Sequence, residues 1–416
     1  MPPNDRSSTA SSEWEGTPCD NLLLSGGDDC HLNVWNALNG KCLDRIATPH
    51  TGNIFCAKWF PDCHMDTIVS SAADDRICLF KNQKHLRTIR EHEGSVHRVA
   101  IFGNQNFMSI SEDGTCKWFD LRSTQCDTMI DSGIDWNSID VNPMNDQEFI
   151  IGGGDKAMKL YDRRLMGEPL QLYQPDVSSA DLPPHITGVR FDRFGRKVLA
   201  SYSAGGIYLF DKHPPSEKTY ECTYSGHANI RTVKEVNFMG QQSEYVISGS
   251  DCGHIFIWDR ETACLINVTR GDQHVVNCLS PHPIHHGVLA SSGIDYNVKL
   301  FEMGVLDDSN DDPKTSLLRN NMAYRCLVMG GHDDELEELL RNNQRRLTRG
   351  HDSIRLPASI ALNLQRILRE ETTGNEEERQ LRLQLVLGAM RQLIQGDNEE
   401  EEEEEEDPLQ PQCRTQ

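Results

Sequence analysis

The chain has 416 residues, with 64 acidic and 41 basic side chains and a net charge of −23. The acidic run at 399–407 supplies nine of these charges, and the remaining body, at about −14, is a poor match for nucleic acid or anionic lipid. No apolar run approaches the roughly 20 residues that a membrane-spanning helix requires.

From the N-terminus, residues 1–21 are polar around Trp14 and show no signal peptide, so we expect a flexible segment. The 14 cysteines of the chain occur singly, without a CxxC pair. This usage is typical of a reducing compartment, in which cysteines serve as small core residues.

One pattern then recurs seven times. A short apolar strand ends in small residues, a turn that usually contains Asp follows, and an alternating strand closes on an aromatic residue. The first copy begins at Leu22 and the last ends at Phe301. The closing aromatics are spaced 39 to 49 residues apart. They are Trp35, Phe80, Phe119, Tyr161, Phe210, Trp258 and Phe301.

The turn of each copy carries a second signal. In five copies an Asp lies six residues before the closing aromatic, whereas the fifth copy has Ala204 there and the sixth has Cys252, with Asp251 beside it. Period, turn residue and aromatic together indicate repeated sheet units. The five turn aspartates are Asp29, Asp74, Asp113, Asp155 and Asp295.

These repeats resemble the WD40 family, whose repeats of about 40–45 residues each form a four-stranded blade. The resemblance implies an all-β, seven-bladed WD40 β-propeller over residues 22–305. By the same resemblance His227, Ser248 and Trp258, with the turn aspartates, form the hydrogen-bond network that locks blades. Because only 21 residues precede Leu22, the sequence leaves open whether the first blade has its innermost strand; without that strand we expect the ring to close weakly.

Two neighbouring copies continue to an Arg three residues after the aromatic, namely Phe119-Asp120-Leu121-Arg122 and Tyr161-Asp162-Arg163-Arg164. Residues 107–122 and 149–164 resemble the DWD box of substrate receptors for cullin-4-type RING ubiquitin ligases. The resemblance implies that Arg122 and Arg164 contact the damage-specific DNA-binding adaptor protein, and that Asp120 and Asp162 hold the two guanidinium groups. The residues alone leave a second interpretation open, in which each Arg makes only a local salt bridge.

Further stretches, residues 225–229, 246–258 and 290–296, look like one subgroup of these receptors. That subgroup includes the nuclear receptor interaction protein and the WD and tetratricopeptide repeats protein. The resemblance implies a receptor in the nucleus, the cytoplasm or both, with a protein substrate that the sequence does not identify.

After the repeats the composition changes. We expect an acidic linker at 306–315, a helical tail at 316–396 and a disordered acidic tail at 397–416. Leu383, Val386, Leu387 and Met390 form an apolar stripe at helical spacing. Such a stripe fits either a helix that docks on a partner or one that packs within this chain.

Catalytic motifs are missing from the sequence: it has no glycine-rich phosphate loop, no GxSxG and no HExxH. His282, His285 and His286 have no Cys or carboxylate at ligand spacing, so we expect no metal site and no cofactor. We therefore predict a non-catalytic substrate receptor that bridges an adaptor and a substrate. The alternative is a WD40 scaffold or transcriptional co-regulator without a ligase.

Overall fold

The computed structural model describes residues 9–14, 22–37, 39–61, 66–175, 185–214 and 220–302. The predicted linker, helical tail and acidic tail lie outside the described residues. Within the described part, no helix is long and apolar enough to cross a bilayer.

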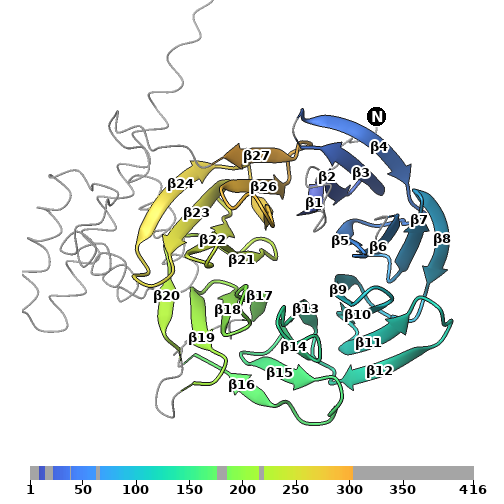
Figure 1. The fold of residues 1–416 in the computed structure, drawn as a ribbon, viewed down its shortest axis with the longest axis horizontal. Helices are drawn as coiled ribbons and strands as arrows, with labels where there is room; N and C mark the ends of the chain where they lie inside the picture. The colour runs from blue at the N-terminus through green and yellow to red at the C-terminus, as the bar shows by residue number, and fades with distance from the viewer. Residues whose placement is uncertain are drawn as a thin grey trace, which may run out of the picture. The chain divides into compact units, whose positions relative to one another are not determined.

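The described strands form seven antiparallel sheets arranged around a central axis (Figure 1). Each sheet is a meander, so its strands run in sequence order from the axis to the rim. The prediction of a seven-bladed β-propeller is confirmed. The innermost strands are β1 (Thr9–Trp14), β5 (Ile54–Trp59), β9 (Val96–Phe102), β13 (Trp136–Val141), β17 (Ile186–Phe191), β21 (Val236–Met239) and β25 (Val276–Pro281).

The two middle strands of every sheet correspond to the seven sequence copies. The second strands are β2 (Leu22–Gly27), β6 (Thr67–Ala72), β10 (Asn106–Ser111), β14 (Glu148–Gly153), β18 (Lys197–Tyr202), β22 (Tyr245–Gly249) and β26 (Val288–Gly293). The third strands are β3 (His31–Asn36), β7 (Ile77–Lys81), β11 (Thr115–Asp120), β15 (Met158–Asp162), β19 (Ile207–Asp211), β23 (His254–Asp259) and β27 (Lys299–Glu302).

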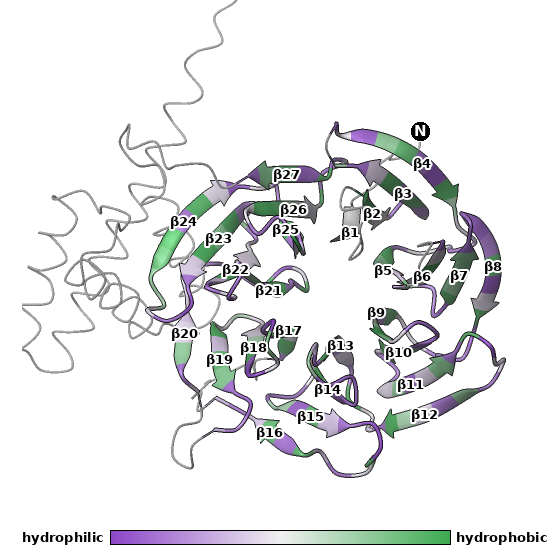
Figure 2. Ribbon diagram, in the orientation of Figure 1, coloured by the Kyte–Doolittle hydropathy of each residue, from purple (hydrophilic) through white to green (hydrophobic). Residues whose placement is uncertain are grey.

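The outermost strands close six of the sheets in the described part of the chain. They are β4 (Lys41–Ala47), β8 (Lys84–Ile89), β12 (Cys126–Asp131), β16 (Gln171–Tyr173), β20 (Cys222–Tyr224) and β24 (Leu265–Arg270). The middle strands β7 and β23 are hydrophobic, whereas the outer strand β8 is largely hydrophilic (Figure 2). This gradient follows burial, because only the outer strands face solvent along the rim.

The core lies between neighbouring sheets. Phe102 and Met108 of the third sheet pack with Phe149 and Tyr161 of the fourth in one buried cluster. A similar cluster joins the fifth and sixth sheets around Trp258. Each such large apolar side chain contributes about 1.5–3 kcal/mol when it is removed from water. Stacking of sheets therefore supplies the main stabilisation of the ring.

The N-terminal expectation needs a correction. We expected residues 1–21 to be flexible, and the sequence left open whether the first blade has its innermost strand. Residues 9–14 instead form β1, which pairs antiparallel with β2, and Trp14 lies opposite Leu23. The mostly polar sequence of β1 carries no alternating apolar pattern from which a strand could be predicted.

Among the side chains that the structure describes, few apolar residues pack at the seam between the last and first sheets. Leu23 and Ala290 are the only fully buried apolar residues of its cluster among the side chains that the structure describes, with Trp35 partly buried beside them. The cluster between the fifth and sixth sheets has twelve. No described sheet combines strands from both ends of the chain, so side-chain packing rather than a shared ladder joins the first and last sheets.

Buried histidines tie the second and third blades internally. His50 contacts Asp74 at 3.0 Å and the Ser70 hydroxyl at 2.8 Å. In the third blade, His92 contacts Asp113 at 2.8 Å, and its other ring nitrogen lies 2.6 Å from the Ser109 hydroxyl. Each network links the loop before the innermost strand to the hairpin between the middle strands.

The pKa shifts in these two networks agree with the burial of the histidines. Burial lowers the pKa of His50 below its ordinary 6.5, although the Asp74 carboxylate opposes the shift. His92 shows the same balance with Asp113. Burial alone would raise the pKa of Asp113, but hydrogen bonds from Thr115, Glu93 and His92 lower it to about 2. Both imidazoles are therefore neutral at neutral pH, and His92 faces an ionised Asp113 carboxylate.

The other turn aspartates make different contacts. Asp29 accepts a hydrogen bond from Arg45 at 2.7 Å, and Asp155 pairs with Lys159 at 2.9 Å. Asp295 accepts the Gln273 amide at 3.1 Å. Asp29 and Asp155 thus brace their own sheet, while Asp295 ties its turn to the loop before β25.

The sixth blade differs from the expected network. The indole N–H of Trp258 donates to the Ser225 carbonyl at 3.0 Å rather than to Ser248, whose hydroxyl donates to the Glu235 carbonyl at 3.4 Å. The ring of His227 lies edge-on to Trp258, with centroids 5.5 Å apart. The indole of this blade is therefore held by a backbone carbonyl.

Asp251, the neighbour of Cys252, takes the place of the missing turn aspartate. Its carboxylate accepts the amides of Ile230 at 2.7 Å and Arg231 at 3.1 Å. It also pairs with the ammonium group of Lys234, and the two side chains are only 3% and 0% exposed. Burial lowers the pKa of Lys234, and the Asp251 charge counteracts this shift. In this blade a buried ion pair thus links the loop before the innermost strand to the hairpin between the middle strands, as a histidine does in the second and third blades.

We expect stability to fall as the pH drops from 7 to 5. The folded state binds protons on His50 and His92 less readily than the unfolded chain does, so their contribution is complete above about 6.5 and is lost below it. Thermal unfolding should show a midpoint lower by on the order of a few degrees at pH 5. His92→Gln should flatten this pH dependence; an unchanged slope would contradict the assignment.

Breaking the buried ion pair should cost far more than breaking a partly exposed one. Asp251→Asn leaves the Lys234 ammonium buried without its counter-charge, which we expect to lower the free energy of unfolding by about 3–5 kcal/mol. Asp155→Asn is the matched control, because its partner Lys159 is 15% exposed and Asp155 itself 31%; its cost should stay below about 1 kcal/mol. Urea denaturation measures both, and equal losses would refute the difference.

Candidate adaptor-binding rim and central channel

Arg122 lies in the turn that follows β11 in the third blade. Its backbone amide donates to Oδ1 of Asp120 at 2.9 Å, which folds the turn back on the strand end. Its guanidinium donates to the same carboxylate, through Nε at 2.9 Å and Nη2 at 2.6 Å. The Arg122 side chain is nevertheless 70% exposed. The turn therefore orients a cation without hiding it.

Arg164 repeats this geometry in the fourth blade, after β15. Its amide, Nε and Nη2 donate to Asp162 at 2.9, 3.0 and 2.6 Å, and its side chain is 62% exposed. Equivalent loops of adjacent meanders lie at the same end of their sheets. The structure thus presents the two arginines on one face, the strand-end face that carries the turns after β11 and β15.

Two carboxylates keep the arginines oriented across a wide pH range. Hydrogen bonds from Arg122 lower the pKa of Asp120 to about 2, and those from Arg164 do the same for Asp162. The guanidinium end of each pair is exposed, although Asp162 itself is buried, and ion pairs open to solvent in this way add little to folding stability. Their effect is to restrict side-chain freedom before any partner arrives, which reduces the entropy cost of binding.

The surface around Arg164 contains features that sequence reasoning missed. Arg163 lies over the Trp118 ring at 5.1 Å and so joins the fourth blade to the third. Met144 and Leu165 are 70% and 66% exposed. Both flank Arg164 on the same face, because the Arg163 amide donates to the Gln147 carbonyl of the β13–β14 loop. No motif marks these residues, but their apolar character within turns is a signal of an interface.

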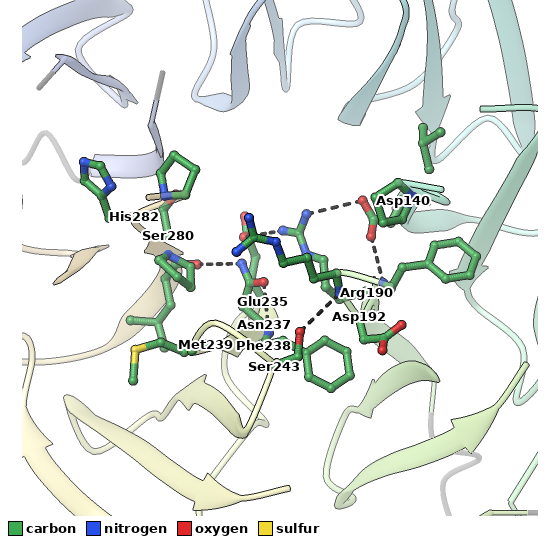
Figure 3. A pocket seen from close by; sticks show the side chains of 18 of the residues that line it. Asp140, Arg190, Asp192, Glu235, Asn237, Phe238, Met239, Ser243, Ser280 and His282 are labelled. Atoms are coloured by element: carbon green, nitrogen blue, oxygen red, sulfur yellow. Dashed lines mark hydrogen bonds and ion pairs between the residues drawn. The ribbon is translucent and has the colours of Figure 1, made fainter. Parts of the chain in front are cut away.

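The same face opens into the central channel. A cavity of about 460 Å³ is lined there by innermost strands and the loops that follow them (Figure 3). Lys58, Asp140, Arg190 and Ser280 come from β5, β13, β17 and β25. These strands converge only in the folded ring, so no local sequence pattern reveals the cavity.

A chain of charges crosses the channel. Arg98 of β9 pairs with Glu235, which immediately precedes β21, and the second oxygen of Glu235 lies 3.7 Å from Arg190. Arg190 in turn lies 3.3 Å from Asp140 (Figure 3). Burial would raise the pKa of Glu235, but the two guanidinium groups lower it. Opposite sides of the ring are thus tied together by ionised groups at neutral pH.

A second cavity, of about 910 Å³, opens at the other end of the channel. It is lined by loops before the innermost strands and by the hairpins between the middle strands, including Tyr296, which is 57% exposed. Phe55 and His97 stack there with centroids 5.1 Å apart. Arg98 and Glu235 line both cavities, so their ion pair forms the floor of each.

The histidine cluster of the last blade makes hydrogen bonds within its own loop and to the β17–β18 turn. Nδ1 of His282 accepts the amides of Ile284 at 3.1 Å and His285 at 2.9 Å. His286 accepts a hydrogen bond from Arg193 at 3.3 Å. In the residues with described placement, no group of three or more potential ligands is arranged to hold a metal ion.

Comparison with known proteins supports the repeat assignment. The model of the family described as "WD domain, G-beta repeat" matches residues 16–36, 40–81, 83–120 and 218–259. These segments cover the first three copies and the sixth. The chain therefore carries WD40 repeats.

Three relatives resemble parts of the chain. "DDB1- and CUL4-associated factor 6" of Homo sapiens is 40% identical over 142 residues, which is 34% of this chain and 14% of the relative. "Protein ALTERED SEED GERMINATION 2" of Arabidopsis thaliana is 29% identical over 253 residues, with 46% of this chain and 32% of the relative covered. "WD and tetratricopeptide repeats protein 1" of Mus musculus is 49% identical over 83 residues, with 20% and 12% covered. The chain thus spans less than a third of the length of each.

Proposed function

We propose that this WD40-repeat protein is a non-catalytic substrate receptor of a cullin-RING ubiquitin ligase. One face of the propeller would bind the adaptor through Arg122 and Arg164, and the opposite face would hold a protein substrate. The observation that carries the proposal is the pair of exposed guanidinium groups, held alike by Asp120 and Asp162 on adjacent blades.

The partner in this proposal is inferred from the similarity to the human relative. The name of the human relative states an association with DDB1 and CUL4, and we extend that association to this chain. A planar guanidinium with five donors suits an interface that offers carboxylates or carbonyls. Met144 and Leu165 would add apolar contact beside Arg164, as is common near interface hot spots.

A scaffold or transcriptional co-regulator that does not join a ligase is the second candidate. The cavity of about 910 Å³ with its exposed Tyr296 favours it, because that end of the channel can bind a partner without any adaptor. The two candidates differ in whether the face that carries Arg122 and Arg164 binds an adaptor.

Replacing both arginines by alanine should separate the candidates. We expect Arg122→Ala with Arg164→Ala to weaken binding to purified DDB1 by at least about 30-fold, since the loss of even one hot spot costs about 2 kcal/mol or more. Arg196→Ala, an exposed arginine in the β17–β18 loop of the same face, is the control and should bind normally. Surface plasmon resonance measures the affinity. Equal binding by all three proteins would refute the receptor proposal and leave the scaffold.

The carboxylates of Asp120 and Asp162 should contribute less to adaptor affinity than the two arginines do. Asp120→Asn with Asp162→Asn keeps both cations but removes the ion pairs that orient them, so we expect a loss of only about three- to tenfold in affinity for DDB1. Unfolding midpoints should stay within about a degree of the parent, because such exposed pairs contribute little to stability. A loss as large as that of the double arginine variant would mean that the aspartates themselves contact the adaptor.

A further inference from the structure

We propose that the cavity of about 460 Å³ on the arginine-bearing face binds a small phosphate-bearing anion. Its lining includes the cations Lys58, Arg98, Arg190 and Arg193 against three carboxylates, and His282 and His286 add two imidazoles. The lining therefore has one more cationic than anionic side chain, whereas the whole chain has a net charge of −23. A recessed site that gathers cations in an acidic protein concentrates anions locally.

The carboxylates of the cavity are already engaged in its wall. Oδ1 of Asp140 faces Arg190 at 3.3 Å, and its Oδ2 accepts the Phe191 amide at 2.8 Å. Asp192 is 2% exposed, and its Oδ1 accepts the amides of Arg196 at 2.6 Å and Lys197 at 2.9 Å. Glu235 lies between two guanidinium groups. These contacts hold the carboxylates in the wall together with Arg98 and Arg190, so we assign the main contact with a ligand to Arg193.

Arg193 supplies the cation at the mouth. It lies on the β17–β18 turn, and its amide donates to the Ser243 hydroxyl of the sixth blade at 3.2 Å (Figure 3). Its Nη1 donates to Nε2 of His286 in the seventh blade at 3.3 Å. The guanidinium is exposed, so its other N–H groups face solvent at the opening. Three blades thus position one arginine.

The shape of the cavity narrows the ligand class. The Arg98–Glu235 pair contributes to the lining, and the cavity has a volume of about 460 Å³, which favours a small ligand over an extended peptide. The volume falls in the range of about 300–1,000 Å³ that small-ligand sites occupy. A phosphate group offers two negative charges and several acceptor oxygens, which suits cations that approach from different blades better than a single carboxylate does.

Pyrophosphate is the probe. Isothermal titration of the full chain with pyrophosphate, at constant ionic strength, should give saturable binding with one site. Arg193→Ala should weaken it by on the order of tenfold or more, because a charge-assisted hydrogen-bond donor at the mouth is lost. Arg196→Ala is the matched control: it removes an exposed arginine from the same turn, outside the cavity lining, and should bind like the parent.

Several results would overturn the assignment. Heats that do not saturate, or an equal loss in Arg193→Ala and Arg196→Ala, would reduce the effect to general surface charge. Binding of a Glu-rich peptide without any binding of pyrophosphate would assign the cavity to an acidic protein segment instead. The Arg122→Ala/Arg164→Ala protein should still bind pyrophosphate, so a failure of the adaptor proposal and a failure of this one are distinguishable.

Discussion

Every sheet of this protein has two faces to bury, and that constraint shapes the rest of the structure. A single sheet leaves at least one apolar face in water, whereas radial stacking covers both faces of each sheet with its neighbours. The buried clusters accordingly lie between sheets, as around Phe149 and Trp258. Because the ring fixes the strands, the turns at their ends become rigid platforms, and the side chains that carry function lie on those turns.

The same constraint explains which elements the sequence reveals. The middle strands are covered on both faces, so they carry apolar runs such as Ile68-Val69, which is fully buried. Outer strands such as β8 are exposed and have mostly polar sequences. The innermost strand β1 has a mostly polar sequence too, and it is recognised from its antiparallel ladder with β2. Sequence pattern therefore finds the strands whose side chains do the packing, and misses those held mainly by backbone hydrogen bonds.

Some candidate site residues can likewise be located from the sequence, and others cannot. Arg122 and Arg164 belong to short local motifs, each with its Asp two residues away, so both can be located from sequence. The channel groups cannot, because Arg98 and Glu235 are 137 residues apart and meet only when the ring is complete. Asp251 is visible beside Cys252 in the sequence, but it lies one residue before the expected turn position, so the repeat spacing does not predict its ion pair with Lys234. Geometry, rather than residue type, identifies these contacts.

The ion pair between Arg98 and Glu235 is shared by the two ends of the propeller axis, because both residues line the cavity at each end. A substitution elsewhere in one cavity leaves the lining of the other unchanged, whereas a change at this pair affects both. An occupant that draws Arg98 toward one side would leave the Glu235 carboxylate less compensated on the other.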